Sequence, residues 1–153
     1  MKKFVKNWLS TGLICVIGIL PRVTKADDFS KLAVLLKPVV GQGGAVTIPP
    51  GDYCLDGTKP LPLASHMTVW AYGARFILPD TIGDKARVIL FAGTNVSDFR
   101  WFGGHFSGRV FDNTKAENSW EPNVNTRGIL LATTAGGRTE NVTFRDVTSD
   151  GLA

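Results

Sequence analysis

The chain has 153 residues, 17 of them Lys or Arg and 13 Asp or Glu, which gives a formal net charge of +4. Five of the basic residues and none of the acidic ones precede Asp27, so the rest of the chain holds 12 basic and 13 acidic residues. This balance gives no support for nucleic acid or an anionic membrane as a partner. With 17 Gly, 8 Pro and short apolar runs, the composition favours strands and tight turns over a helical bundle.

Residues 1–26 have the pattern of a cleavable export signal. Three lysines near the start precede an apolar run from Trp8 to Leu20, which is short for a membrane span. Thr24-Lys25-Ala26 then offers a cleavage site that ends in a small residue. We therefore expect the mature chain, one domain over residues 27–153, to begin at Asp27 and to be secreted or periplasmic without a stable membrane anchor. A retained single-pass anchor is the alternative.

One helix is predicted at the start of the mature chain, from about Asp28 to Leu36. Asp28 can cap its first turn, and Leu32, Leu35 and Leu36 fall on one face at i, i+3, i+4 spacing. Pro38 is expected to end the helix, because proline cannot donate a helical hydrogen bond. A glycine-rich break follows, and the pattern changes to that of short strands.

From residue 46 onward, short apolar strands and turns recur with linkers of varying length. Turn pairs that would close adjacent strands into hairpins are mostly absent, which favours parallel pairing of successive copies over an antiparallel sandwich. The sequence therefore predicts an all-β parallel solenoid whose first end is covered by the helix. The expected strand segments are 46–48, 52–55, 61–63, 67–70, 75–78, 88–92, 96–101, 105–106, 128–131, 142–144 and 150–152.

The copies align in two registers that differ by one residue. One register matches Asn95-Val96-Ser97 with Asn141-Val142-Thr143. A slip of one residue exchanges the two faces of a strand, so both registers can hold only with a bulge, which we expect near Asp98. The other register stacks three apolar residues in one file and three polar residues in a second: Val69, Phe99 and Phe144, then Arg75, His105 and Asp150.

The final residues, Gly151-Leu152-Ala153, are apolar and carry no polar cap. Exposed strand edges at the end of such a stack invite association. We therefore expect the chain to be the truncated N-terminal part of a longer domain, with self-association through its last turn as a consequence.

Two stretches of these residues resemble the right-handed parallel β-helix proteins of the pectate lyase and polygalacturonase superfamily. The first resembles that superfamily's N-terminal opening and comprises Val46-Thr47-Ile48-Pro49-Pro50-Gly51-Asp52-Tyr53, Leu61-Pro62-Leu63 and Tyr72-Gly73-Ala74. The second resembles the turn that follows and runs from Asn95-Val96 to Gly103-Gly104-His105-Phe106-Ser107-Gly108. The resemblance implies a right-handed β-helix and an exported protein that binds a pectin-like acidic polysaccharide and, at full length, cleaves it by hydrolysis or β-elimination. The Asn-Thr-Asp and Gly-His-Gly motifs of polygalacturonases are absent.

Cleavage of such a polymer needs either two carboxylates or a base that removes the proton beside a uronate carboxylate. The nearest carboxylate pair is Asp146 and Asp150, which share a face on a continuous strand, although a corner is expected near residues 148–151. Two solvated turn aspartates are the alternative. In the polar file, His105 and Asp150 would lie one strand spacing apart and could share a proton. A polar ladder without a catalytic role is the alternative there.

The segment between Gly108 and Gly128 is the expected binding loop, because it is longer than a turn requires. Trp120 can stack on a sugar ring or instead pin this loop to the strands. Three arginines can bind hydroxyl or carboxylate groups of the polymer: Arg109, Arg127 and, on a strand, Arg75. No cofactor is evident, and calcium held by Asp112 with Asp146 or Asp150 is the alternative.

Two other functions stay open from the sequence alone. One is a non-catalytic surface module of adhesin or tailspike type, and the other is an inactive truncated fragment. Further turns with clustered carboxylates or basic residues would distinguish an enzyme from a structural module.

Overall fold

The computed structural model describes residues 28–55, 57, 59–78, 87–108 and 125–150. These residues are mostly β-structure with one helix, α1 (Phe29–Gln42). The strands follow in chain order as β1 (Gly44–Thr47), β2 (Gly51–Cys54), β3 (Leu61–Pro62), β4 (Met67–Trp70), β5 (Ala74–Ile77), β6 (Arg87–Thr94), β7 (Arg100–Phe102), β8 (His105–Ser107), β9 (Asn125–Ala132), β10 (Thr143–Arg145) and β11 (Thr148–Asp150). Each of these strands overlaps a segment expected from the sequence.

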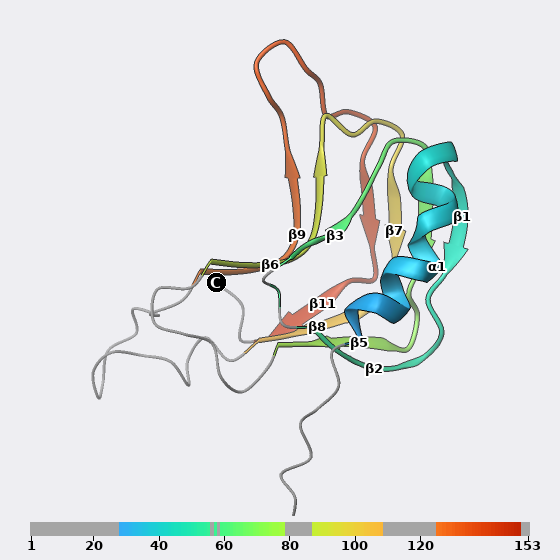
Figure 1. Ribbon diagram of the computed structural model, residues 1–153, viewed down its shortest axis with the longest axis vertical. Helices are drawn as coiled ribbons and strands as arrows, with labels where there is room; N and C mark the ends of the chain where they lie inside the picture. The colour runs from blue at the N-terminus through green and yellow to red at the C-terminus, as the bar shows by residue number, and fades with distance from the viewer. Residues whose placement is uncertain (1–27, 56, 58, 79–86, 109–124, 151–153) are drawn as a thin grey trace, which may run out of the picture.

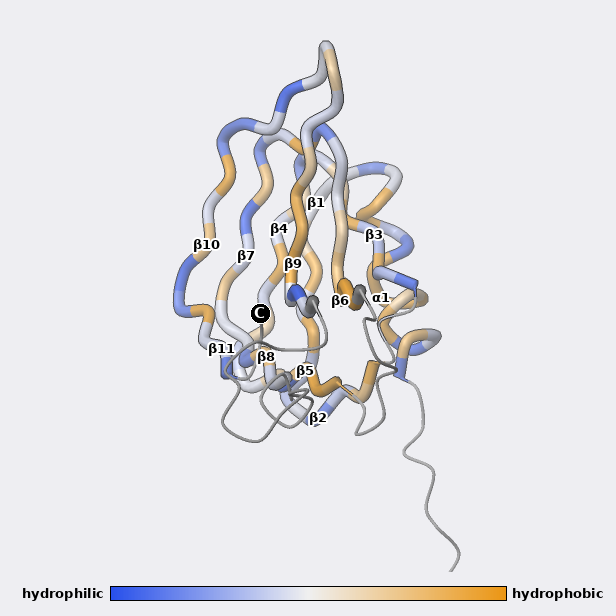
Figure 2. The backbone as a smooth tube through the Cα atoms, turned by 90° about the vertical axis from the view of Figure 1, so that its left-hand side faces the viewer, coloured by the Kyte–Doolittle hydropathy of each residue, from blue (hydrophilic) through white to orange (hydrophobic). Residues whose placement is uncertain are grey.

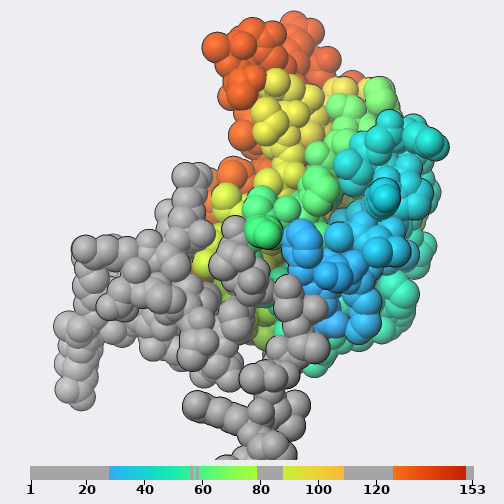
Figure 3. All heavy atoms as spheres, in the orientation of Figure 1, coloured from blue at the N-terminus to red at the C-terminus, as the bar shows by residue number. Residues whose placement is uncertain are grey.

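Strands three apart in chain order pair with one another and form three parallel sheets. The first sheet has the order β1-β4-β7-β10, the second β2-β5-β8-β11 and the third β3-β6-β9. Figure 1 shows the sheets on three sides of a common interior, and Figure 3 shows that the chain advances across the molecule from α1 to the last strands. The expected parallel pairing is confirmed, and an antiparallel sandwich is wrong.

Helix α1 runs through Pro38, so the expectation that Pro38 ends it is wrong. Proline removes one hydrogen bond from a helix interior, but the apolar face of this helix continues beyond it. Leu32, Leu36 and Val39 are all buried against the strands, and their burial offsets the missing hydrogen bond. The helix stops before Gly43, whose φ is 72° and whose N–H donates to the Val39 carbonyl at 2.8 Å.

Asp28 occupies the N-cap position, but its side chain does not cap the helix as expected. The carboxylate instead accepts hydrogen bonds from the Cys54 N–H at 3.0 Å and from the Lys31 ammonium group at 2.8 Å. The backbone N–H of Asp28 also donates to the Cys54 carbonyl at 2.8 Å. Asp28 therefore joins the start of α1 to the end of β2.

The interior is filled by side chains that stack in files from one strand to the next. Trp101 and Phe76 are fully buried, and their rings meet edge to face with centroids 5.9 Å apart. Apolar and polar positions alternate along the strands of the first sheet (Figure 2), which directs the polar side chains outward. The inner file of the first sheet is Val46, Val69, Trp101 and Phe144, and that of the second is Tyr53, Phe76, Phe106 and Ser149.

The expected stacking of Val69, Phe99 and Phe144 is wrong by two residues. Trp101, rather than Phe99, pairs with both Val69 and Phe144. A slip of two residues keeps the same face, so Phe144 still belongs to the inner file. The shift arises at the corners, since four residues separate the paired positions 70 and 75 whereas only two separate 102 and 105.

In the second sheet, Arg75 pairs with His105 as expected. His105 then pairs with Thr148, and Asp150 pairs with Ser107 instead of joining the file of Arg75 and His105. The expected position of Asp150 is therefore wrong by two residues along the strand.

The alternative register is also wrong, since Ser97 bridges to Glu140, three residues before its expected partner. Asp98, where a bulge was expected, has a left-handed φ of 54°. His66 and Asn141 in the adjacent turns have φ values of 62° and 54°, and they contact the Asp98 carboxylate at 3.3 and 3.0 Å. The same turn therefore recurs in successive copies, and no bulge separates two registers.

Candidate functional site

An open hollow of about 300 Å³ lies where three connections between the first and second sheets stack on one another. These connections run from β4 to β5, from β7 to β8 and from β10 to β11, so the hollow gathers residues that are far apart in the sequence. We call it the corner hollow. Its lining residues are Tyr72, Gly73, Ala74, Arg75, Gly103, Gly104, His105, Asp146 and Thr148.

The Tyr72 side chain crosses the neighbouring connection to reach Asp146 in the connection beyond it. Its hydroxyl donates to the Asp146 carboxylate at 2.6 Å. A Cβ at Gly103 would lie 2.7 Å from Cδ1 of the Tyr72 ring, and the φ of Gly103 is 76°, so the crossing requires glycine at this position. The hydrogen bond to Asp146 raises the pKa of Tyr72, and desolvation and the negative charge of Asp146 act in the same direction. Tyr72 is thus held as a neutral hydrogen-bond donor.

His105 lies between Arg75 and Thr148 in an outward file of the second sheet. Its Nδ1 is 2.9 Å from Oγ1 of Thr148, and its Nε2 is 3.6 Å from Oδ2 of Asp150. The imidazole therefore has a hydroxyl group on one side and a carboxylate near the other, an arrangement that can transfer a proton or bind a polar ligand. The proximity of His105 and Asp150 predicted from the sequence is present, but it is diagonal across the strands.

Arg75 pairs across the sheet with Asp52 on one side and His105 on the other. Its side chain is exposed and lines the corner hollow. Among the residues that the structure describes, its guanidinium group has no hydrogen-bond or ion-pair partner. A guanidinium group with its donors free is suited to a carboxylate or another planar anion of a ligand.

Asp146 and Asp150 make separate contacts, Asp146 with Tyr72 and Asp150 with His105. In the described part of the chain, no contact joins the two carboxylates. Asp146 has a φ of 58° and lies in the connection itself, whereas residues 148–150 form β11. The corner expected near residues 148–151 is therefore wrong, since the chain turns before Thr148.

The other predicted site residues are not part of the corner hollow. Arg127 lies on β9 in the third sheet, away from the connections that form the hollow (Figure 1). Trp120, Arg109 and Asp112 lie outside the described residues, so the predictions on them stay untested. Within the described ranges, no group of three or more His, Cys, Asp or Glu side chains could hold a metal ion, and calcium binding stays a prediction.

Sequence reasoning missed Thr148 and the aromatic side chains at the corner. Tyr72 entered only as part of a corner motif, and Trp70 only as the end of a strand. A signal was present, because Trp70 and Phe102 occupy matching outward positions in two successive copies. It could be recognised only with the correct register, which places Phe102 beside Trp70.

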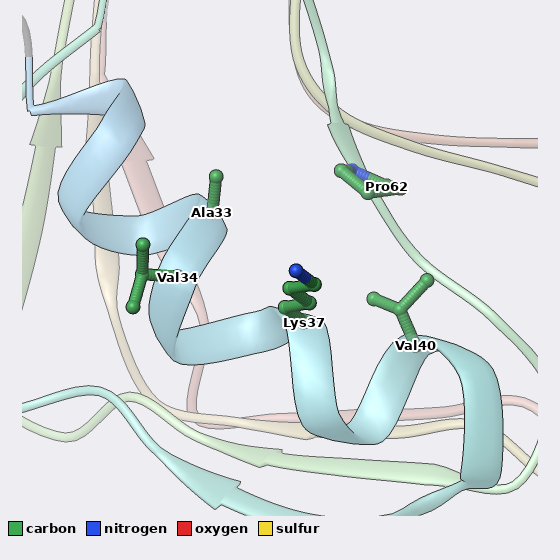
Figure 4. A pocket seen from close by; sticks show the side chains of 5 residues that line it. All are labelled: Ala33, Val34, Lys37, Val40 and Pro62. Carbon is green, nitrogen blue, oxygen red and sulfur yellow. The ribbon is translucent and has the colours of Figure 1, made fainter.

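A second hollow of about 270 Å³ lies between α1 and β3 (Figure 4). Its described lining residues are Ala33, Val34, Lys37, Val40 and Pro62. Lys37 is the one ionisable side chain among these five, so they do not supply the several convergent polar groups that orient a polar ligand. The corner hollow is the stronger candidate site.

No protein-family model, curated protein or solved structure matches the chain. Within the residues that the structure describes, no helix is both long and apolar enough to cross a membrane. The residues of the corner hollow are therefore the features of the chain that bear on its function.

Proposed function

We propose that the chain is a right-handed parallel β-helix protein that binds a pectin-like acidic polysaccharide in the corner hollow. The parallel pairing of strands three apart supports the β-helix. The observation that carries the function is the unpartnered Arg75 guanidinium group beside the His105 imidazole, among the described residues. Export directed by residues 1–26, and cleavage of the bound polymer, belong to the same proposal.

The groups in the corner hollow match those of a uronate sugar. Arg75 can hold a carboxylate through two parallel N–H donors. His105 and Thr148 can exchange hydrogen bonds with sugar hydroxyls, because each can act as donor or acceptor. The hollow is open to solvent, so a residue within a long polymer can enter it without a chain end having to pass through a closed entrance.

The substitution Arg75→Gln tests the proposal, because glutamine keeps a polar side chain but removes the charge. We expect the affinity for oligogalacturonate to fall about tenfold or more, since a hydrogen bond to a charged group contributes roughly 1.5–3 kcal/mol. Titration calorimetry measures the change. Arg138→Gln is the matched control, since Arg138 is an exposed arginine between β9 and β10 with only Glu140 as an ion-pair partner among the described residues, at 3.4 Å. Equal affinities for the two variants would contradict the proposal.

A non-catalytic binding module is the second candidate function. It is favoured by the contacts that both carboxylates of the predicted catalytic pair already make within the protein, Asp146 with the Tyr72 hydroxyl and Asp150 with the His105 imidazole. Incubation with polygalacturonate separates the two functions. An enzyme releases unsaturated or reducing chain ends and slows in the His105→Gln variant, whereas a binding module retains the polymer and releases neither product.

A further inference from the structure

Trp70 lies on the outer face of the first sheet, next to the corner hollow. The residue is 40% exposed, and its indole stacks on Phe102 of the next strand, with centroids 4.3 Å apart and 15° between the ring planes. Phe102 therefore covers one face of the indole. On the opposite side Trp70 pairs with Thr47 of β1, which is also exposed. A threonine side chain covers less of an indole than an aromatic ring does, which leaves this second face as the more exposed one of a residue that is 40% exposed.

Tyr72 connects the open indole with the corner hollow. Its ring centroid lies 6.4 Å from that of Trp70, with 27° between the planes, while its hydroxyl is held by Asp146 in the hollow. A polymer that binds beside Arg75 can therefore continue past Tyr72 to Trp70 along one surface.

We propose that the open face of Trp70 is a second subsite, which stacks on the apolar face of another sugar ring in the same polysaccharide chain. This inference rests on the proposed function, because the polymer held in the corner hollow is also the occupant of the second subsite. An aromatic face next to hydroxyl groups suits a sugar, which has apolar faces and polar edges.

The neighbours of Trp70 favour a sugar ring over a protein partner. A stable protein interface buries about 800 Å² on each partner and has an apolar centre. The other outward residues of the first sheet are mostly small or polar: Ala45, Thr47, Thr68, Arg100, Thr143 and Arg145. The aromatic area is therefore a narrow row of rings, and its continuity with the hollow assigns it to the same ligand.

The substitution Thr47→Gln tests the subsite without altering Trp70, because a longer side chain at residue 47 would cover the open indole face. Ala45→Gln is the matched control, since Ala45 is an exposed residue on the same face of β1 but pairs with Thr68. Affinity is measured for a length series of oligogalacturonates. In the unmodified protein and in Ala45→Gln we expect affinity to rise with length beyond the shortest oligomer that binds. In Thr47→Gln we expect the increase in affinity from short to long oligomers to be about three- to tenfold smaller. This factor corresponds to the free energy that one aromatic contact contributes.

A second variant, Trp70→Ala, should lose the same gain with length while the shortest oligomer still binds as before. Its melting temperature is measured as well, because the stack with Phe102 is lost. An undiminished gain with length in Thr47→Gln and Trp70→Ala overturns the aromatic subsite and leaves the proposed function intact. A loss of affinity that is equal for short and long oligomers also overturns the aromatic subsite, since Trp70 would then affect binding in the corner hollow and not at a separate subsite. Absence of binding to any oligomer overturns both the subsite and the proposed function.

Discussion

Two tryptophans on the same sheet have opposite environments. Trp101 is fully buried, packs against Phe76 and Phe91, and its indole N–H donates to the Gly103 carbonyl at 2.9 Å. Trp70 lies one strand away on the outer face, is 40% exposed and contacts only Phe102 and Tyr72 among the described aromatic rings. The indole is the same in both places, so the difference lies in what each face of the ring meets.

This architecture separates the residues that stabilise the fold from those that are available for binding. Inward side chains meet the strands beside them and the other two sheets, so their contacts are fixed by the fold. Outward side chains meet only neighbours on the outer surface, so part of such a side chain can stay free for a ligand. Substitutions of inward residues are therefore expected to lower stability, and substitutions of outward residues are expected mainly to change binding.

The largest effect is expected for Trp101→Ala. Loss of a buried tryptophan typically costs about 3–5 kcal/mol of unfolding free energy, whereas Trp70→Ala should cost about 1 kcal/mol, because Trp70 loses mainly one aromatic stack. Urea denaturation of the two variants measures both values. Trp101→Phe serves as a milder inner variant if Trp101→Ala does not fold. Similar losses for Trp101→Ala and Trp70→Ala would refute the separation of inner and outer roles.

A smaller effect is expected where the outer surface depends on backbone geometry. Gly103 and Gly136 have nearly equal φ values, 76° and 79°, but a Cβ at Gly103 would meet Tyr72 whereas one at Gly136 has nothing within 4 Å. Gly136→Ala should therefore cost only the backbone strain, about 1 kcal/mol. Gly103→Ala should cost about 2–3 kcal/mol, because the Tyr72 ring and backbone must also shift. Thermal and urea denaturation of the two variants measure the difference, and equal losses would show that Tyr72 does not depend on Gly103.

The strand segments and their parallel pairing could be predicted, because β-branched runs bounded by Gly and Pro are local signals and hairpin turns were missing. The register could not, because it depends on how many residues each corner absorbs. Trp70 and Arg75 are separated by more residues than Phe102 and His105, and no local signal reports this difference. The passage of α1 through Pro38 likewise depends on tertiary burial beyond the proline.

The candidate site likewise contains one contact that could be predicted from the sequence and one that could not. The pairing of Arg75 with His105 follows from aligning adjacent copies, and it was predicted. The hydrogen bond between Tyr72 and Asp146 joins residues 74 apart in the sequence and skips one copy, so an alignment of adjacent copies cannot show it. The Tyr72 side chain can cross the connection between β7 and β8 because that connection has a glycine, Gly103, at the crossing point. Gly103 is therefore the sequence feature that could have indicated this contact.

The smallest expected effect concerns the two tyrosines, which repeat the contrast between inner and outer positions. The pKa of Tyr53 is raised chiefly by burial, and that of Tyr72 chiefly by its hydrogen bond to Asp146. Asp146→Asn should therefore lower the pKa of Tyr72 towards the ordinary tyrosine value of about 10 and leave that of Tyr53 unchanged. Absorbance titration of phenolate formation measures both groups, and Tyr72→Phe identifies the signal of Tyr53, because the chain has 2 tyrosines.

The pH dependence of stability has a definite sign. A raised pKa means that the folded state keeps the Tyr72 proton longer than the unfolded state does, so the stabilising effect is present below about pH 10 and is lost as the pH rises through the folded-state pKa. The unmodified protein should therefore lose more stability in this alkaline range than Asp146→Asn does. Equal alkaline losses would mean that the Tyr72–Asp146 hydrogen bond does not persist in solution, and the ring of Tyr72 would then lack the anchor that holds it between the hollow and Trp70.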